Sequence, residues 1–245
     1  MKQESARVDG RANDEMRSIE ITPGFMPNAE GSALIKTGNT HVICTASVEP
    51  RVPRWLAGEG KGWVTAEYSM LPRSTTERVR RDRGGKLGGR TQEIQRLIGR
   101  SLRAGIDLSV LGENSILIDC DVLQADGGTR TAAITGAYVA LSGAIAWLRE
   151  RGSLDEDPLL GGIAAVSVGI IGGTPMLDLA YEEDSRADVD MNIVMNGGGR
   201  FVEVQGTAEG QAYSADEMNN MLALAKVGID ELSTEQDRAI RSMYS

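Results

Sequence analysis

Two adjacent glycines followed by Thr-Arg, at the junction of a strand-like run and a helical pattern, predict a binding site for an anion. The junction lies within residues 118–134, where Gly127 and Gly128 precede Thr129 and Arg130. Glycines let the backbone turn its amides toward one point, and the start of a helix adds unpaired N–H groups and the positive end of its dipole. Because phosphate offers three or four oxygens to these amides and to a forked guanidinium, it suits the site better than a carboxylate.

Acidic residues concentrate in residues 178–190, which leave one predicted strand and enter the next. Asp184 in the loop and Asp190 at the start of the following strand are placed to converge. They could supply oxygen ligands for a Mg²⁺ or Mn²⁺ ion that keeps several waters and meets a phosphate. One of them could equally act as a general acid on a leaving oxygen. A solvated acidic loop or a structural cation site is the alternative, although the calcium-loop pattern is missing.

Basic residues concentrate between Arg73 and Arg103, in a chain whose formal net charge is −9. This segment holds ten Lys or Arg and three Asp or Glu, a net charge of about +7, which leaves about −16 on the remainder. Such asymmetry is typical of a surface that binds a polyanion on an otherwise acidic protein. A solvated basic face is the alternative.

The elements that must position these groups predict an α+β fold. Residues 32–48 alternate around Gly38-Asn39, and residues 164–181 repeat the strand, glycine turn, strand pattern, so each predicts a hairpin. The remaining pattern predicts helices over 91–105 and 131–150, strands over 115–123, 189–195 and 200–205, and a C-terminal helix. Long helices do not alternate strictly with single strands, which disfavours a doubly wound sheet.

A weak internal similarity predicts that one domain, residues 1–245, contains two related α+β halves. The halves span about 9–150 and 160–245, and charge, Gly and Pro cluster between them. The C-terminal helix has a clear start signal, because Ser214 and Glu217 match the capping box.

The predicted helix over residues 91–105 has an apolar face and a basic face. The two faces consist, respectively, of Ile94, Leu97, Ile98 and Leu102, and of Arg96, Arg100 and Arg103. Arg90 differs from the other arginines because it lies at the start of the helix, after two glycines. It is therefore placed to point into a site.

Several common catalytic devices are missing from the chain. The single histidine, His41, lies in a predicted hairpin strand, and no nucleophile elbow or Walker-type loop occurs. Cys44 and Cys120 stand singly in apolar segments, which favours buried structural thiols over a disulfide or zinc site. We expect no apolar run near the ~18 residues of a membrane span and no secretory signal, so we predict a soluble cytoplasmic protein without a membrane partner.

Together, these features suit phosphoryl chemistry on a polynucleotide. If the anion site holds free inorganic phosphate, that phosphate can attack the terminal phosphodiester directly. The nucleophile is then already an anion and needs no strong general base, which would explain a site without histidine. Cations would stabilise the charge that builds on the non-bridging oxygens.

Five long signatures, in the same order as in the family, resemble ribonuclease PH. They comprise residues 60–73, 89–103, 118–131, 181–192 and 202–207, and the match extends from about Asp9-Gly-Arg11 to the C-terminal helix. The resemblance implies the ribonuclease PH fold, similar to domain 2 of ribosomal protein S5, with duplicated β-α units and mixed sheets.

The resemblance also implies an activity and its residues. The implied enzyme is a phosphorolytic 3′ to 5′ exoribonuclease that trims the 3′ ends of transfer RNA precursors and releases nucleoside 5′-diphosphates. Nucleotide addition is the reverse reaction. Other RNA 3′ ends, including those of ribosomal RNA, are implied as further substrates. Arg90, Gly128, Thr129 and Arg130 would bind the attacking phosphate, and the Asp184–Asp190 pair would serve catalysis and the divalent metal.

For RNA and assembly, the resemblance implies a basic surface and a ring. We predict that RNA is bound by the arginine-rich loop and by arginines of the following helix: Arg73, Arg78, Arg80, Arg81, Arg83, Lys86, Arg96 and Arg100. The family assembles as a homohexamer, a trimer of dimers. An inactive RNA-binding ring subunit and a hydrolytic metal-dependent nuclease are the alternatives. The first predicts loss of the arginine or the acids, and the second predicts a denser set of metal ligands.

Overall fold

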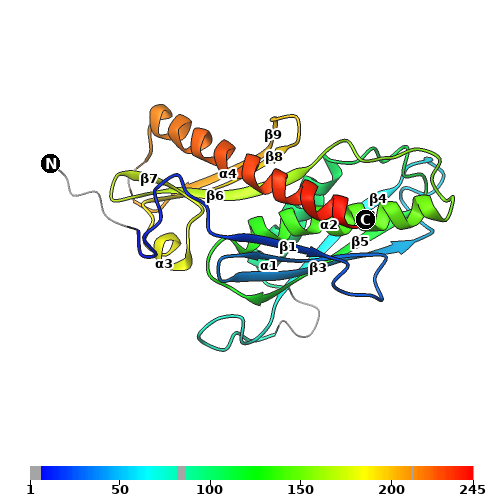
Figure 1. The fold of residues 1–245 in the computed structure, drawn as a ribbon, viewed down its shortest axis with the longest axis horizontal. Helices are drawn as coiled ribbons and strands as arrows, with labels where there is room; N and C mark the ends of the chain where they lie inside the picture. Colours follow the sequence, from blue (N-terminus) through cyan, green and yellow to red (C-terminus); the bar gives the residue numbers. More distant parts are fainter. Residues whose placement is uncertain (1–6, 82–86, 211, 245) are drawn as a thin grey trace.

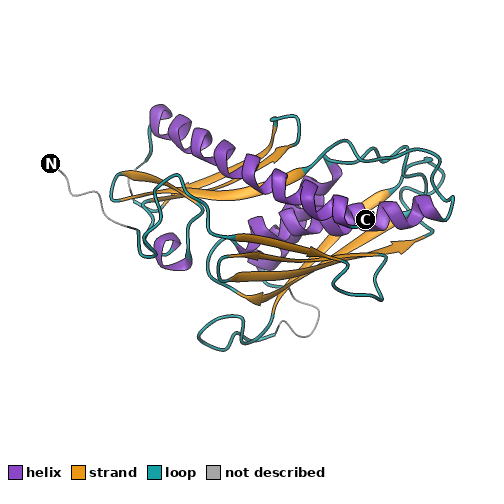
Figure 2. Ribbon diagram, viewed as in Figure 1, coloured by secondary structure: helices purple, strands orange, loops and turns teal. Residues whose placement is uncertain are grey.

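Two β-sheets and four helices form the part of the chain that the computed structural model describes, residues 7–81, 87–210 and 212–244. The first half of the chain contributes five strands and the second half four (Figure 1). Helices lie against both sheets (Figure 2). The α+β class predicted from the sequence is confirmed.

The first sheet is mixed. Its strands lie in the order β1 (Ile19–Pro23), β2 (Gly31–Thr37), β3 (Thr40–Glu49), β5 (Ser115–Gln124) and β4 (Trp63–Met70). β4 pairs with β5 in parallel, whereas the other pairs are antiparallel. A parallel pair needs a crossover, and the segment between β4 and β5 contains a helix that provides it.

The second sheet is antiparallel throughout. Its strands lie in the order β7 (Thr174–Leu177), β6 (Ile163–Ile171), β8 (Val189–Asn196) and β9 (Phe201–Ala208). Because β9 is an edge strand, one side of its backbone has no strand partner in this sheet.

Both predicted hairpins are present, with turns at Gly38-Asn39 and at Gly172-Gly173. The second hairpin ends at Leu177, earlier than predicted, because the following residues enter a short helix instead of continuing the strand. β1 and β4 were not predicted as strands. β1 has only five residues, which is too short for a clear alternating pattern.

The helices cover the sheets in two layers. α1 (Gly89–Arg103) packs on β4, and α2 (Thr129–Glu150) lies between the first sheet and β6. α4 (Ala215–Ser242) contacts the second sheet and β1, so it ties the two halves together. α3 (Tyr181–Asp184) is a single turn. The capping box predicted at Ser214 is confirmed, since Ser214 and Glu217 exchange side-chain and backbone hydrogen bonds.

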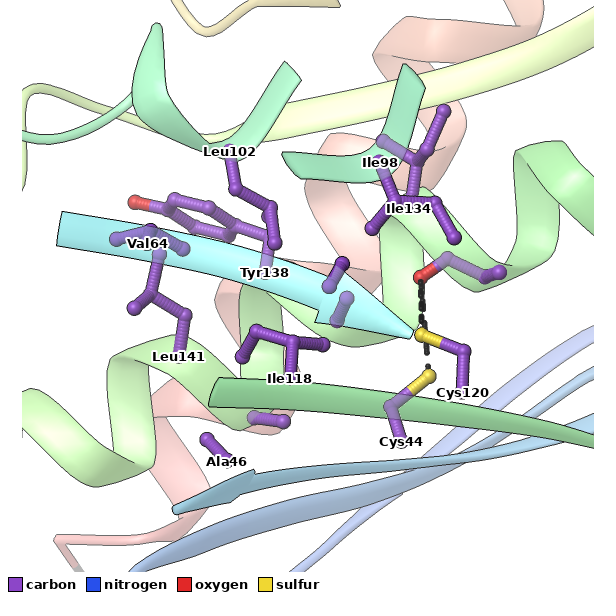
Figure 3. Close-up of a cluster of buried hydrophobic side chains, with 14 of the residues drawn as sticks. Cys44, Ala46, Val64, Ile98, Leu102, Ile118, Cys120, Ile134, Tyr138 and Leu141 are labelled. Atoms are coloured by element: carbon purple, nitrogen blue, oxygen red, sulfur yellow. Dashed lines mark hydrogen bonds between the residues drawn. The ribbon is translucent and has the colours of Figure 1, made fainter. Parts of the chain in front are cut away.

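The main core lies between the first sheet and the helices α1 and α2. Figure 3 shows residues of the core, including Cys44 and Cys120, whose sulfurs both approach the Ala133 carbonyl oxygen. Both cysteines are buried free thiols, as predicted. Proximity to the Cys44 thiol and burial raise the pKa of Cys120, so it stays protonated and unreactive.

One expectation from the sequence is wrong. α2 is long and apolar enough to cross a membrane by length and composition, although no such run was expected. In the structure, 83% of its most apolar 18-residue window is buried inside the protein. Small residues allow that burial; at Gly136, for example, an added Cβ would lie 2.7 Å from an Ile35 methyl carbon. α2 is therefore the central core helix.

The apolar face predicted for α1 is confirmed, and its contribution to the stability of the fold can be tested by mutation. Ile98 is fully buried in the main core, whereas Leu87, just before the helix, is 42% exposed. We expect Ile98→Ala to lower the free energy of unfolding by about 2–5 kcal/mol through lost burial and the cavity left behind. Leu87→Ala is the matched control and should cost much less. Equal losses in urea unfolding would contradict this assignment of the core.

Candidate active site

A polar cavity of about 1210 Å³ lies where the two halves of the chain meet. Its walls come from the loop after β4, the start of α1, the β5–α2 junction, α3 and β8. Its lining includes Arg73, Arg78, Arg90, Gly127, Gly128, Thr129, Arg130, Ser167, Tyr181, Asp184, Asp190 and Asn192. The structure therefore brings the predicted anion site and the predicted carboxylate pair to one place.

The glycine pair has the conformation that the anion site needs. Gly127 and Gly128 have φ values of +73° and +64°, and Gly128 is the N-cap of α2. A Cβ added at Gly127 would lie 2.4 Å from the carbonyl oxygen of Leu179. A side chain there would collide with the backbone that leads into α3, so Gly127 allows the two halves of the site to touch. No acidic residue occupies the first turn of α2 to compete with a bound anion.

Thr129 and Arg130 are held at the cavity wall by protein contacts. The Tyr68 hydroxyl donates to Thr129 Oγ1 at 2.8 Å, and Arg130 Nη1 donates to Gln205 Oε1 at 3.1 Å. Glu93 Oε2 lies 3.7 Å from Arg130 Nη2 and also holds Gln205, whose amide donates to Glu93 Oε1 at 3.2 Å. Because a guanidinium has five N–H donors, this arrangement orients Arg130 and leaves donors for an anion.

Arg90 lies in the first turn of α1 and lines the same cavity as Arg130. Both arginines act on the same neighbour: burial raises the pKa of Tyr68, and the charges of Arg90 and Arg130 oppose that rise. Both arginines therefore contribute positive charge to the same part of the cavity. Phosphate binding by Arg90 and Arg130 stays a prediction.

Asp184 ends α3, and Asp190 is the second residue of β8. Partial burial raises the pKa of Asp184, the negative charge of Asp190 raises it further, and Arg90, Arg130 and Arg17 oppose the rise. The two carboxylates are thus close enough to interact, as the sequence predicted. Their roles in catalysis and metal binding stay predictions.

A divalent metal fits this pair with part of its coordination left to other groups. No cluster of three or more His, Cys, Asp or Glu that could hold a metal occurs among the described residues. Mg²⁺ often binds through one or two carboxylates together with waters and substrate phosphates. Two carboxylates, those of Asp184 and Asp190, are therefore enough protein ligands for it.

The predicted RNA-binding residues are divided among several places. Arg73 and Arg78 line the cavity, and Arg80 and Arg81 are exposed in the same loop. Arg83 and Lys86 lie outside the described residues. Arg96 and Arg100 instead line a separate hollow of about 450 Å³ together with Arg103 and Trp63. There Arg100 pairs with Glu203 at 3.2 Å, and the Arg103 guanidinium stacks 4.3 Å above the Trp63 ring.

Two family models match most of this chain. They are those of domain 1 and domain 2 of the 3′ exoribonuclease family, which match residues 15–145 and 161–228. This chain belongs to that family. The resemblance and the fold inferred from the sequence signatures are therefore confirmed.

Similar proteins support the same placement. A protein named ribonuclease PH from Corynebacterium efficiens is 61% identical over 235 residues, and another from Corynebacterium glutamicum strain R is 59% identical over 236; each match covers 96% of both chains. A chain of the Archaeoglobus fulgidus exosome, solved with RNA bound to the active site, superposes with a TM-score of 0.78 at 24% identity. That match covers 98% of this chain and 93% of the other, and it supports the fold.

Sequence reasoning missed several residues around the site. Asp178, first in the acidic segment, does not reach the cavity but is buried and paired with Arg17. Asp126 accepts a hydrogen bond from the Tyr181 amide at 3.2 Å and so joins the two halves of the site. The resemblance covered these positions, but no pattern in the residues themselves indicated which acids would be buried. His41 lies in β3 and does not line the cavity.

The raised pKa of Asp184 predicts a stability effect that depends on pH. Because the folded-state pKa lies above the unfolded value, the folded chain holds this proton more tightly, and stability falls as the pH rises through these values. Asp184→Asn removes that cost. We expect it to raise Tm at pH 7 in buffer with EDTA, and the gain should shrink as the pH falls toward about 3.9, the ordinary pKa of Asp.

The matched control for this measurement is Asp155→Asn, which alters an exposed carboxylate away from the cavity. It should change Tm little at either pH. A lower Tm for Asp184→Asn at pH 7 would contradict the assignment of an electrostatic cost to Asp184.

Proposed function

We propose that this protein is a phosphate-dependent 3′ to 5′ exoribonuclease that trims transfer RNA precursors and releases nucleoside 5′-diphosphates. Membership of the 3′ exoribonuclease family and high identity to proteins named ribonuclease PH support the activity. The observation that carries the mechanism is that a glycine-arginine anion site and a carboxylate pair line one cavity beside an arginine-bearing loop.

The proposed reaction is an in-line displacement at the terminal phosphodiester. Inorganic phosphate binds to Arg90, Arg130 and the amides around Gly128 and Thr129, and one of its oxygens attacks the phosphorus of the last nucleotide. The bond from that phosphorus to the 3′ oxygen of the shortened RNA breaks, and this oxygen takes up a proton. The last nucleotide leaves as a 5′-diphosphate. Arginines at the cavity wall stabilise the charge on the non-bridging oxygens.

Asp184 and Asp190 have two alternative roles in this scheme, because a carboxylate that binds a metal is ionised and one that donates a proton is protonated. As a pair they would hold Mg²⁺ or Mn²⁺, which when bound supplies charge stabilisation to the phosphate oxygens. The raised pKa of Asp184 also suits a proton donor to the leaving 3′ oxygen. Phosphorolysis exchanges a phosphodiester bond for the phosphoanhydride bond of the diphosphate without hydrolysis, and nucleotide addition from diphosphates is the reverse reaction.

The wider setting is proposed from the family. We infer a cytoplasmic homohexamer, a trimer of dimers, that acts on transfer RNA precursors and other RNA 3′ ends. Exposed apolar residues on the edge strand β9, Phe201 at 50% and Val204 at 39%, are consistent with a further subunit contact. Arg73, Arg78, Arg80 and Arg81 would guide the RNA toward the cavity.

The proposed activity is tested with a transfer RNA that carries extra 3′ nucleotides, incubated with Mg²⁺ with and without inorganic phosphate. We expect phosphate-dependent release of 5′-diphosphates, identified by mass spectrometry. Arg90→Ala and Arg130→Ala should each raise the phosphate KM by about tenfold or more, the loss expected for a charged hydrogen bond, while the RNA dissociation constant changes little. Arg54→Ala, which removes an exposed arginine outside the cavity lining, is the matched control.

Other outcomes would replace this proposal. Release of 5′-monophosphates without phosphate would make the protein a hydrolase, and RNA binding without release would make it an inactive RNA-binding subunit. Equal weakening of RNA and phosphate binding in the arginine variants would remove the proposed phosphate roles.

A second test concerns the basic loop. Replacing Arg78, Arg80 and Arg81 with alanine should reduce the salt dependence of RNA binding, with the logarithmic slope falling by roughly 0.7 for each lost phosphate contact. The control replaces Arg54, Arg149 and Arg238, which removes the same charge from exposed sites elsewhere. If both triple variants change the slope equally, net charge and not the loop determines RNA binding.

A further inference from the structure

Three arginines of the N-terminal segment form a buried ion network with two acids near α3. The network consists of Arg7, Arg11 and Arg17 with Asp178 and Glu183. None of these residues is among those that line the described cavity. In Figure 1 the N-terminal segment, in dark blue, runs beside α3, in yellow. The network therefore lies behind the wall of the site, and the proposed reaction gives it no direct role.

Arg17 and Asp178 bind each other at both carboxylate oxygens. The backbone amide and Nε of Arg17 each donate to Asp178 Oδ2 at 2.9 Å, and Nη2 donates to Oδ1 at 2.7 Å. Asp178 has a φ of +52°, and among the described residues it is the only non-glycine with positive φ. Residues other than glycine rarely adopt this backbone conformation. Position 178 therefore carries a carboxylate although glycine would fit the backbone with less strain.

The same guanidinium also reaches the phosphate site. Arg17 Nη1 donates to the backbone carbonyl oxygen of Asp126, the residue before the glycine pair. A Cβ added at Gly128 would lie 3.2 Å from Arg17 Nη2, so the guanidinium packs against the N-cap of α2. One side chain thus contacts the junction that carries the phosphate site and the acid that leads into α3.

Arg7 and Glu183 fix α3 from the other side. Arg7 Nε donates to Glu183 Oε1 at 2.8 Å, and Nη2 donates to Oε2 at 2.6 Å. Arg7 also donates to the carbonyl oxygens of Leu177 at 2.8 Å and Asp178 at 3.0 Å. Glu183 precedes Asp184 directly and accepts the Ala180 amide at 3.0 Å at the start of the helix. The position of Asp184 is therefore tied to this network.

The two acids of the network are ionised. The network contributes more to the orientation of the groups it holds than to the stability of the fold. Burial by itself would raise the pKa of Asp178, but the hydrogen bonds and charge of Arg17 outweigh it, so the pKa lies below its ordinary value. Glu183 follows the same pattern with Arg7. Removing such charges from water is costly, and apolar replacements of buried ion pairs are often equally stable. Directional hydrogen bonds supply what an apolar contact would not, a fixed orientation.

We propose that Arg17 and Asp178 are positioning residues that hold the phosphate site and Asp184 at a fixed separation across the cavity. This inference rests on the proposed function. It assigns a role to the buried acid of the acidic segment, and to an N-terminal arginine that is not among the residues lining the cavity.

The test measures steady-state phosphorolysis by wild type, Arg17→Lys and Asp178→Asn, with rates expressed per folded molecule. Asn tolerates the positive φ at position 178, and Lys keeps the charge at position 17 without the fork, so both changes are mild. We expect a higher phosphate KM and a lower kcat, with kcat/KM for phosphate falling roughly tenfold or more, because small misplacements cost up to about a hundredfold. The RNA dissociation constant should stay unchanged.

Gln236→Leu is the matched control for lost stability. Gln236 is buried and donates to the carbonyl oxygens of Thr135 and Ile163, both at 2.8 Å, and it does not line the cavity. It should lower Tm while leaving kcat and the phosphate KM of the folded enzyme unchanged. Variants of Arg17 and Asp178 that behave like this control would overturn the positioning role, as would a parallel loss of RNA affinity.

The measurements distinguish failure of the proposed function from failure of the positioning role. If wild type releases no 5′-diphosphates, the proposed function itself is wrong, and the positioning role falls with it. If wild type is active and both variants match it in kcat and phosphate KM, the network is only structural. Titration calorimetry with inorganic phosphate alone gives a second readout, in which the variants should bind phosphate more weakly than Gln236→Leu does.

Discussion

The site depends on one close approach between two stretches of backbone. At Gly127 the junction of β5 and α2 lies so near the chain at Leu179–Tyr181 that a Cβ would fall within 2.8 Å of backbone atoms there. This contact sets the distance between the phosphate site, built by the first half of the chain, and the carboxylates, built by the second. A larger residue would separate the two walls, and neither wall alone contains the full set of groups.

Opposite charges on the two walls of the cavity favour the close approach of the two stretches of backbone. The cavity gathers its arginines from the first half of the chain and acids from both halves, including Asp184 and Asp190 of the second, so each set reduces the repulsion within the other set. The compensation is incomplete at Asp184, whose pKa stays raised by burial and by Asp190. Incomplete compensation of this kind is common where groups are arranged to act on a substrate and not to stabilise the fold. A bound phosphate and a divalent ion would complete the balance.

The sequence predicted the elements well where local chemistry determines them. Gly38-Asn39, the capping box at Ser214 and the apolar face of α1 each act through neighbours in sequence, and all three are confirmed. The long apolar run of α2 was misjudged, because composition does not tell a core helix from a membrane span until its surroundings are known. The family resemblance also indicated the main residues of the cavity, since its signatures cover Arg90, the glycine pair and both acids, but they leave out residues 74–79 and Ser167.

The burial of Asp178 and Arg17 could not be predicted in the same way. They are 161 residues apart, and the acidic segment that contains Asp178 has the composition of a solvated loop. Which acid turns inward depends on the backbone, and at Asp178 that backbone has the positive φ that other residues avoid. Such a conformation results from the folded surroundings, so no local pattern records it.

The shortness of α3 gives the network its importance. A helix of four residues has no stability of its own, because nucleation costs more than a single turn returns. The orientation of Asp184 must therefore come from tertiary contacts. They include the ion pairs of Arg7 with Glu183 and of Arg17 with Asp178, and the hydrogen bond from the Tyr181 amide to Asp126. The chain therefore combines a single-turn helix with ion pairs to the N-terminal segment, and these ion pairs hold the residue next to Asp184 in place.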